Sequence, residues 1–160
     1  MGLELGKGQI IMPHDHQICI NTAIASAEAI CQKQGLRFTP IRQRVLRIIW
    51  ENHQAIKAYD ILEQLQQIDK SAKPPTAYRA LEFLLQHGFI HRIESLNAYI
   101  GCPHPEHTHH FQLLICENCG TVKEMDEPEL STLVEKKVAK HNFKIQQQVI
   151  EVHGLCSSCS

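Results

Sequence analysis

Hydrophobic residues recur at helical spacing through the first half of the chain, in four stretches separated by short polar or proline-containing segments. Apolar positions three and four residues apart predict helices that each turn one side toward a core. Asn21 or Thr22 and Thr39 are predicted to cap the first two helices, and the next two are predicted to begin near Tyr59 and Thr76. The predicted core positions are Ile24, Ala27, Ile30, Val45, Leu46, Ile49, Trp50, Ile61, Leu62, Leu65, Ala77, Leu81, Leu84 and Leu85.

The hydrophobic period changes after Gly88, which is a good helix terminator. Two short strands are predicted at 89–94 and 98–101, and the three residues between them would close a β-hairpin. Helices followed by such a hairpin are typical of a winged helix-turn-helix, in which one helix enters the DNA major groove.

The remainder of the chain predicts a small unit with both strands and a helix. Strands are expected at 111–115, 121–125 and 145–152, and a helix with one apolar face is expected to begin at Pro128. A unit of about 50 residues buries too little surface to be secure alone, so a metal ion and a second copy of the chain are expected to stabilise it.

Four of the seven cysteines form two C-x-x-C pairs, Cys116 with Cys119 and Cys156 with Cys159. Four thiolates complete a closed tetrahedral Zn²⁺ site that leaves no position for water. The 36 residues between the pairs are enough for a helix and a strand, so the zinc would join both ends of a small domain. A disulfide or a redox pair is the alternative, and the odd cysteine count argues against it.

These patterns predict an α+β fold, in which an N-terminal winged helix-turn-helix domain precedes a small α/β dimerisation domain with structural zinc. The expected parts are a flexible N-terminal tail (1–17), the winged-helix DNA-binding domain (18–101), a hinge (102–110) and the dimerisation and metal-binding domain (111–160).

Composition narrows the setting in which the protein works. No hydrophobic run approaches the length of a membrane span, and no secretory signal is recognised, so we expect a cytoplasmic protein without a membrane partner. The net charge is −1, but residues 32–100 carry ten Lys and Arg against six Asp and Glu. This local excess suits contact with DNA phosphates, and ordinary surface charge is the alternative.

A second group of metal-binding residue types follows the predicted hairpin. Five of the eleven histidines lie between positions 91 and 110, with Cys102 among them. A hairpin that turns about residues 96–97 would place His91 directly opposite Cys102, with Cβ atoms about 5 Å apart. A histidine beyond the hinge and a carboxylate such as Glu124 would complete the set, and imidazole with thiolate favours Zn²⁺. The alternative is that these histidines are solvated loop residues.

Several motifs together resemble the ferric uptake regulator family, and most closely its zinc uptake regulator branch, over about residues 20–160. The motifs are Arg37-Phe38-Thr39-Pro40-Ile41-Arg42, Ala58-Tyr59-Asp60, Pro75-Thr76-Ala77-Tyr78-Arg79-Ala80-Leu81, Cys116-Glu117-Asn118-Cys119-Gly120 and His153-Gly154-Leu155-Cys156.

The resemblance implies a homodimeric metal-sensing repressor with two zinc ions per subunit, one structural and one regulatory. It implies that the ligands of the regulatory zinc are His91, Cys102, His109 and Glu124, and His107 or His110 remains an alternative to His109. The iron-type His-His-Asp-His string of the family is absent, which argues against the alternative of an iron- or peroxide-responsive regulator.

The same resemblance implies that the recognition helix begins near Thr76 and that Tyr78, Arg79 and Tyr59 contact DNA. The position of Arg79 opposite the apolar stripe predicts a guanine contact in the major groove. A surface ion pair with Glu82 is the alternative. Phosphate contacts are expected from Thr76 and Tyr78, and also from Lys73.

Two other classes of function are alternatives to a zinc-responsive repressor of zinc uptake genes. A zinc hydrolase would need an open coordination position, which four protein ligands deny, so we expect no catalytic residue and no small organic substrate. A zinc-stabilised interaction module would not need the basic segment around the predicted recognition helix. The function that the sequence favours is therefore repression of transcription by a metal-loaded homodimer that binds operator DNA.

Overall fold

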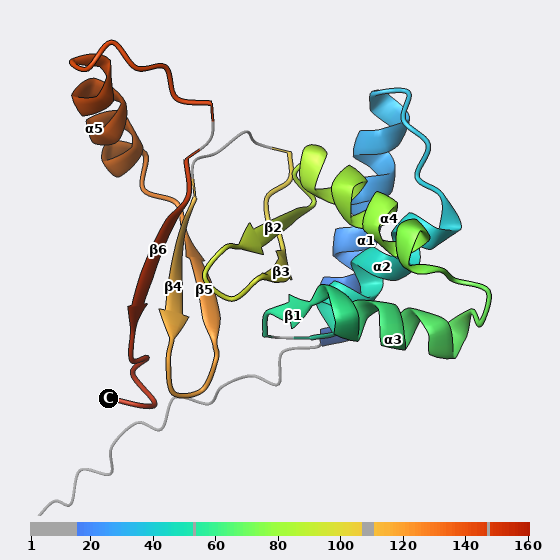
Figure 1. Ribbon diagram of the computed structural model, residues 1–160. Helices are drawn as coiled ribbons and strands as arrows, with labels where there is room; N and C mark the ends of the chain where they lie inside the picture. Colours follow the sequence, from blue (N-terminus) through green and yellow to red (C-terminus); the bar gives the residue numbers. More distant parts are fainter. Residues whose placement is uncertain (1–15, 53, 107–110, 147) are drawn as a thin grey trace, which may run out of the picture.

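A computed structural model describes residues 16–52, 54–106, 111–146 and 148–160 (Figure 1). No helix in these ranges is long and apolar enough to cross a membrane. The predicted α+β class is confirmed. In chain order the elements are α1 (His16–Lys33), α2 (Pro40–Glu51), β1 (Ile56–Lys57), α3 (Ala58–Ile68), α4 (Pro74–Gln86), β2 (Ile90–Ile93), β3 (Ala98–Gly101), β4 (Gln112–Cys116), β5 (Val122–Met125), α5 (Pro128–Ala139) and β6 (Ile150–Gly154).

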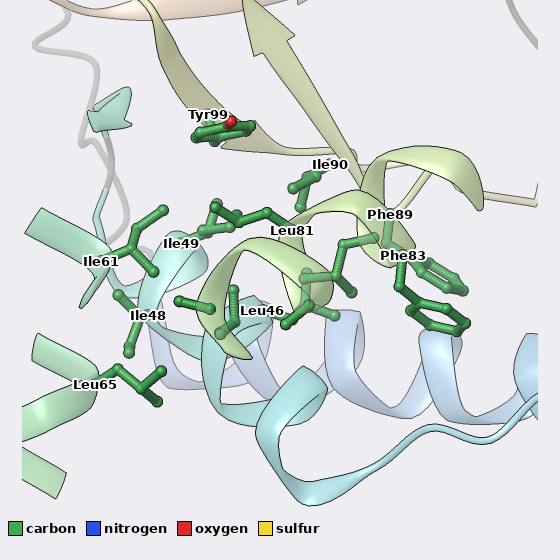
Figure 2. Packing of buried hydrophobic residues seen from close by; sticks show 14 of the residues in the cluster. Leu46, Ile48, Ile49, Ile61, Leu65, Leu81, Phe83, Phe89, Ile90 and Tyr99 are labelled. Atoms are coloured by element: carbon green, nitrogen blue, oxygen red, sulfur yellow. The ribbon is translucent and has the colours of Figure 1, made fainter. Parts of the chain in front are cut away.

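The helices α1 to α4 enclose the larger core, and their predicted apolar stripes face into it. Leu46, Leu81 and Leu84 are at most 2% exposed, whereas Trp50 and Leu85 are only partly buried at its margin. Figure 2 shows Phe83 and Phe89 side by side at one end of this core. The hydrophobic pattern therefore predicted the packing of this half of the molecule from sequence.

Two helix starts differ from the prediction. The helix α1 is already formed at His16, the first described residue, and does not start after Asn21 or Thr22; the buried Ile20 extends its apolar stripe by one turn. The helix α4 begins at Pro74, since prolines are tolerated in a first turn whose N–H groups have no helical partner.

Two three-stranded sheets complete the fold, with strand orders β1-β3-β2 and β5-β4-β6. The antiparallel pair β2 and β3 forms the wing, and Figure 1 shows it between the helices and the second sheet. In the second sheet, β4 pairs antiparallel with β5 and parallel with β6. The strand β6 begins five residues later than the predicted 145–152 and ends two residues later, since it pairs with the five residues of β4.

A second hydrophobic cluster joins the wing to the C-terminal sheet. Ile93 of the wing is fully buried against Leu113, Ile115 and Val122, and Ile100 packs against the same cluster. A polar contact lies at the edge of this interface, where the Gln54 side chain donates a hydrogen bond to the Cys119 carbonyl at 3.0 Å. The core beneath the C-terminal sheet is therefore shared with the wing.

The helix α5 stands at the edge of the C-terminal sheet, away from the other helices (Figure 1). Its one fully buried residue is Ser131, which accepts a hydrogen bond from the buried Gln112 side chain at 3.4 Å. Leu133 of α5 is 51% exposed, and Val152 of β6 is 48% exposed. This part of the described chain leaves apolar surface that its own residues do not cover.

Candidate metal centres and nucleic-acid interface

The four paired cysteines meet at one edge of the C-terminal sheet. Cys116 ends β4, and Cys156 follows β6, so the parallel pairing of these strands brings both C-x-x-C pairs together. Their four sulfur atoms lie within 4.8 Å of one another. Gly120 has a positive φ of 71°, which lets the chain turn back from the first pair into β5.

Backbone hydrogen bonds favour the thiolate form of one member of this cluster, Cys116, whereas the neighbouring cysteines contribute to raising the pKa of Cys159 to about 11. The backbone N–H of Cys119, followed by that of Cys156, lowers the pKa of the Cys116 thiol to about 6. The sulfur atoms of Cys119 and Cys156 are 3.7 Å apart, so ionising all four thiols requires a cation among them. Four adjacent thiols at one point have the chemistry of a closed tetrahedral zinc site. The residues present therefore fit a structural zinc ion.

The second group of donors draws on both halves of the molecule. His91 lies on β2, Cys102 follows β3, and Glu124 lies on β5, and their donor atoms are within 4.8 Å of one another. His91 Nε2 is 3.3 Å from a Glu124 carboxylate oxygen. The His91 ring also packs on the Phe111 ring, with centroids 3.6 Å apart. His109, the fourth predicted ligand, lies outside the described residues, as do the alternatives His107 and His110.

The predicted hairpin register was wrong by two residues, although His91 and Cys102 do meet. His91 stands opposite Ile100, because the hairpin turns through the four residues 94–97 and not about residues 96–97. Cys102 is therefore two positions further along, on the same face and diagonal to His91. Diagonal neighbours of this kind remain within reach of long side chains.

Burial makes this second site unfavourable for a bare thiolate. Cys102 is 2% exposed, and burial, followed by the nearby Glu124 carboxylate, raises the pKa of its thiol to about 12. A divalent cation would stabilise a thiolate and a carboxylate held this close together. The soft sulfur and the imidazole nitrogen suit zinc better than calcium or magnesium. The described donors therefore fit a zinc ion that links the wing to the C-terminal sheet.

The sequence did not predict the close packing of Gly101, the residue before Cys102, against Trp50. A Cβ atom added at Gly101 would run into the indole ring of Trp50, so the wing backbone passes directly against this side chain. Trp50, Gly101 and Glu124 line the same cavity of about 310 Å³. A glycine inside a strand signals such a close approach, but it does not name the partner.

The predicted DNA-contacting residues lie on exposed parts of α3 and α4. Tyr59 is 74% exposed and Tyr78 is 52% exposed, which is unusual for large aromatic side chains. Arg79 also points to solvent, and within the described ranges it forms no ion pair with Glu82, the predicted alternative. Lys73, at the N-cap position of α4, and Thr76, in its first turn, are exposed as well.

Comparison with known proteins places this arrangement in a family. The model of the ferric uptake regulator family matches residues 33–153. The zinc uptake regulation protein of Escherichia coli (strain K12) is 43% identical over 137 residues, which cover 85% of this chain and 80% of that protein. A solved zinc uptake regulator complexed with zinc and DNA superposes with a TM-score of 0.84 at 41% identity, covering 87% of this chain and 93% of that one.

Another relative has been solved in a holo form and in an apo form, and the two forms match this structure to different degrees. The holo form of XcZur matches with a TM-score of 0.81 at 38% identity, over 86% of this chain and 96% of that one. The apo form matches with a TM-score of only 0.50 at 36% identity, over 89% of this chain and 98% of that one. The structure is thus more similar to the holo form than to the apo form. With the family model matching most of its length, the chain belongs to the ferric uptake regulator family and is similar within it to the zinc uptake regulation proteins.

Proposed function

We propose that this protein is a zinc-responsive transcriptional repressor that binds operator DNA as a metal-loaded homodimer and controls zinc uptake genes in the cytoplasm. The observation that carries this proposal is the donor set His91, Cys102 and Glu124, which spans the wing and the C-terminal sheet. The thiol in this set favours zinc over the harder metal ions that an iron- or peroxide-responsive regulator would bind. The family is one of transcriptional regulators, and we propose no enzymatic activity.

Each subunit holds two zinc ions, one structural and one regulatory, at separate sites. Cys116, Cys119, Cys156 and Cys159 hold one ion that joins the ends of the C-terminal unit. His91, Cys102 and Glu124, completed by His109 from the segment after the wing, hold the regulatory ion. A divalent cation bound at the regulatory site would neutralise the buried thiolate and carboxylate together. It would thereby favour the closed form, in which the wing packs against the C-terminal sheet.

Packing of the wing against the C-terminal sheet controls DNA binding, because it sets the distance between the two recognition helices of a dimer. Two helices read successive major grooves only when they lie about 34 Å apart. Because zinc binds the closed arrangement better, it shifts the population toward the form with this spacing, and operator DNA in turn tightens zinc binding. The likeness to holo and DNA-bound relatives supports this arrangement as the active one.

We propose residues 18–101 as the DNA-binding domain, 102–110 as the hinge and 111–160 as the dimerisation domain. Support for a dimer comes from α5, whose apolar face is left uncovered by the described chain. The exposed Leu133 and Val152 would be covered by the same surface of a second copy, as in a two-fold symmetric interface.

The Leu133→Asp protein is expected to dissociate into monomers, since the dimer would have to bury a charge that costs several kcal/mol. A penalty of that size weakens the dimer at least about 100-fold. Sedimentation of the full chain with zinc measures the mass of both proteins. Thr132→Asp is the matched control, because it adds the same charge one residue earlier, and this variant should remain dimeric. A dimeric Leu133→Asp protein at micromolar concentration would overturn the assignment of this face.

The Arg79→Ala protein is expected to lose discrimination of its operator by about 1–3 kcal/mol, the value of one bidentate guanine contact. Binding to random DNA should change little, whereas Lys73→Ala should weaken both kinds of binding and flatten the salt dependence. Titration of each variant against operator and random duplexes at two salt concentrations measures this. Equal losses of Arg79→Ala on both duplexes would remove Arg79 from the residues that read sequence.

The function itself is tested by selecting duplexes from a random DNA pool with the full-length protein. A repressor of this kind should recover one symmetric sequence in the presence of zinc and should release it on chelation of the regulatory ion. Recovery of no preferred sequence, or of the same sequence after chelation, would contradict the proposed function.

A further inference from the structure

Glu151 of β6 reaches out of its own sheet and binds the tip of the wing. One carboxylate oxygen accepts a hydrogen bond from the backbone N–H of Glu94 at 2.6 Å. The other accepts one from the backbone N–H of Ser95 at 3.2 Å. The Glu151 side chain is only 12% exposed, and its two donors lie 57 and 56 residues earlier in the chain.

The register of the C-terminal sheet explains how Glu151 comes to face the wing. Leu113 of β4 pairs with Glu124 of β5 on one side and with Glu151 of β6 on the other. Paired residues of neighbouring strands point to the same face, so both carboxylates flank Leu113 on the face that packs against Ile93. A carboxylate on such an apolar face costs desolvation unless hydrogen bonds compensate it.

The two carboxylates hold opposite ends of the wing. Glu124 meets His91 and Cys102 at the open end of the hairpin, where the chain enters and leaves it. Glu151 meets the closed end at residues 94–95, the first half of the turn. A hairpin held at one end can still swing about that point, whereas one held at both ends has a fixed orientation.

Several groups around Glu151 hold its carboxylate in the charged form. His153 Nε2 lies 3.6 Å from the second carboxylate oxygen. Burial alone would raise the pKa of the Glu151 carboxyl, but hydrogen bonds from Ser95, Glu94 and His153 outweigh this and bring the pKa below its ordinary value. Hydrogen bonds to a charged acceptor are stronger than those to a neutral one.

We propose that Glu151 is a positioning residue that fastens the tip of the wing to the C-terminal sheet and thereby sets the zinc concentration at which the protein closes. This inference rests on the proposed zinc-dependent function, and it adds a second attachment point that contains no metal ligand. Because hydrogen bonds to a charged group are stronger than average, losing both should lower the ratio of closed to open protein by about tenfold or more.

The test compares three variants with wild-type full-length protein. Glu151→Ala removes the acceptor, and Glu151→Gln keeps an oxygen acceptor but removes the charge. Ser95→Pro removes one donor from the other side of the contact, at the second position of the turn, where proline is well tolerated. The control is Glu117→Ala, which removes an exposed carboxylate that also faces His153, at 3.9 Å, but lies on another segment.

The first measurement is hydrogen exchange of the amides of residues 94 and 95, which involves no DNA. These amides should exchange about tenfold faster or more in Glu151→Ala, less so in Glu151→Gln, and at the wild-type rate in Glu117→Ala. Unchanged exchange in Glu151→Ala would overturn the contact itself. This result does not depend on whether the protein is a zinc-responsive repressor.

The second measurement is the zinc concentration that gives half-maximal binding of the selected duplex. It should rise about tenfold in Glu151→Ala and by less in Ser95→Pro, which leaves the Glu94 hydrogen bond in place. The double variant should rise no further than Glu151→Ala, because both changes act on one contact. The amount of zinc bound at the four-cysteine site and the thermal unfolding midpoint should stay at wild-type values. An unshifted zinc midpoint, or additive effects in the double variant, would overturn the positioning role even if wild-type binding is zinc-dependent.

Discussion

Replacing Cys119 with serine is expected to release the structural zinc ion and unfold the C-terminal unit. Structural zinc sites of this kind bind with about 10–16 kcal/mol, and this binding energy is also folding energy. A whole domain is stable by only about 5–15 kcal/mol, so no other interaction in a small unit replaces the ion. The dimer should be lost together with the fold, because the proposed interface lies on this unit.

Zinc content by elemental analysis, circular dichroism and sedimentation measure the three parts of this expectation. Ser158→Ala is the control, since it changes an exposed residue of the second C-x-x-C loop, between Cys156 and Cys159, and removes no metal ligand. It should keep its zinc, its fold and its dimer. A folded, dimeric Cys119→Ser protein with wild-type zinc content would rule out the four-cysteine site.

Replacing Cys102 with alanine is expected to abolish zinc-dependent DNA binding while the fold and the dimer persist. Cys102 is the one thiol in the second donor set, and even outer-shell partners of a metal are worth about 10–100-fold in affinity. Loss of a direct ligand should therefore cost at least about 100-fold in zinc affinity. Operator binding should fall to the level of the chelated wild-type protein.

Zinc titration monitored by binding of the selected duplex measures this effect. The matched control is Cys31→Ala, which removes a buried thiol from the core of the helical half, away from both donor sets. This variant should respond to zinc as the wild type does. Normal zinc-stimulated binding by Cys102→Ala would remove Cys102 from the regulatory site. Single alanine substitutions of His107, His109 and His110 would identify the remaining ligand.

The sequence predicted most of the helical half because burial there follows a local rule. Each stripe repeats at helical spacing, and residues such as Leu46, Leu81 and Leu84 are buried as expected. The grouping of the four cysteines was equally predictable, since the C-x-x-C spacing alone indicates a metal site. The starts of α1 and α4 were less predictable, because Ile20 and the tolerance of prolines in a first turn allow each helix to begin earlier.

The contacts between elements that are distant along the chain could not be read in the same way. The meeting of His91 and Cys102 was predicted from a wrong register, and a diagonal contact gave the same proximity. The packing of Gly101 on Trp50 joins residues 51 positions apart, and Glu151 binds the wing turn across 57 positions. Such contacts depend on how separate helices and strands are placed against each other, which no local pattern encodes.

The hydrophobic core shared by the wing and the C-terminal sheet has a thermodynamic consequence. If regulatory zinc closes the wing over Leu113, Ile115 and Val122, binding of that ion also removes apolar surface from water. Burial of apolar surface carries a negative heat-capacity change, and its contribution weakens on cooling. The set point of the sensor would then depend on temperature, with part of its response to zinc supplied by water released from an apolar interface.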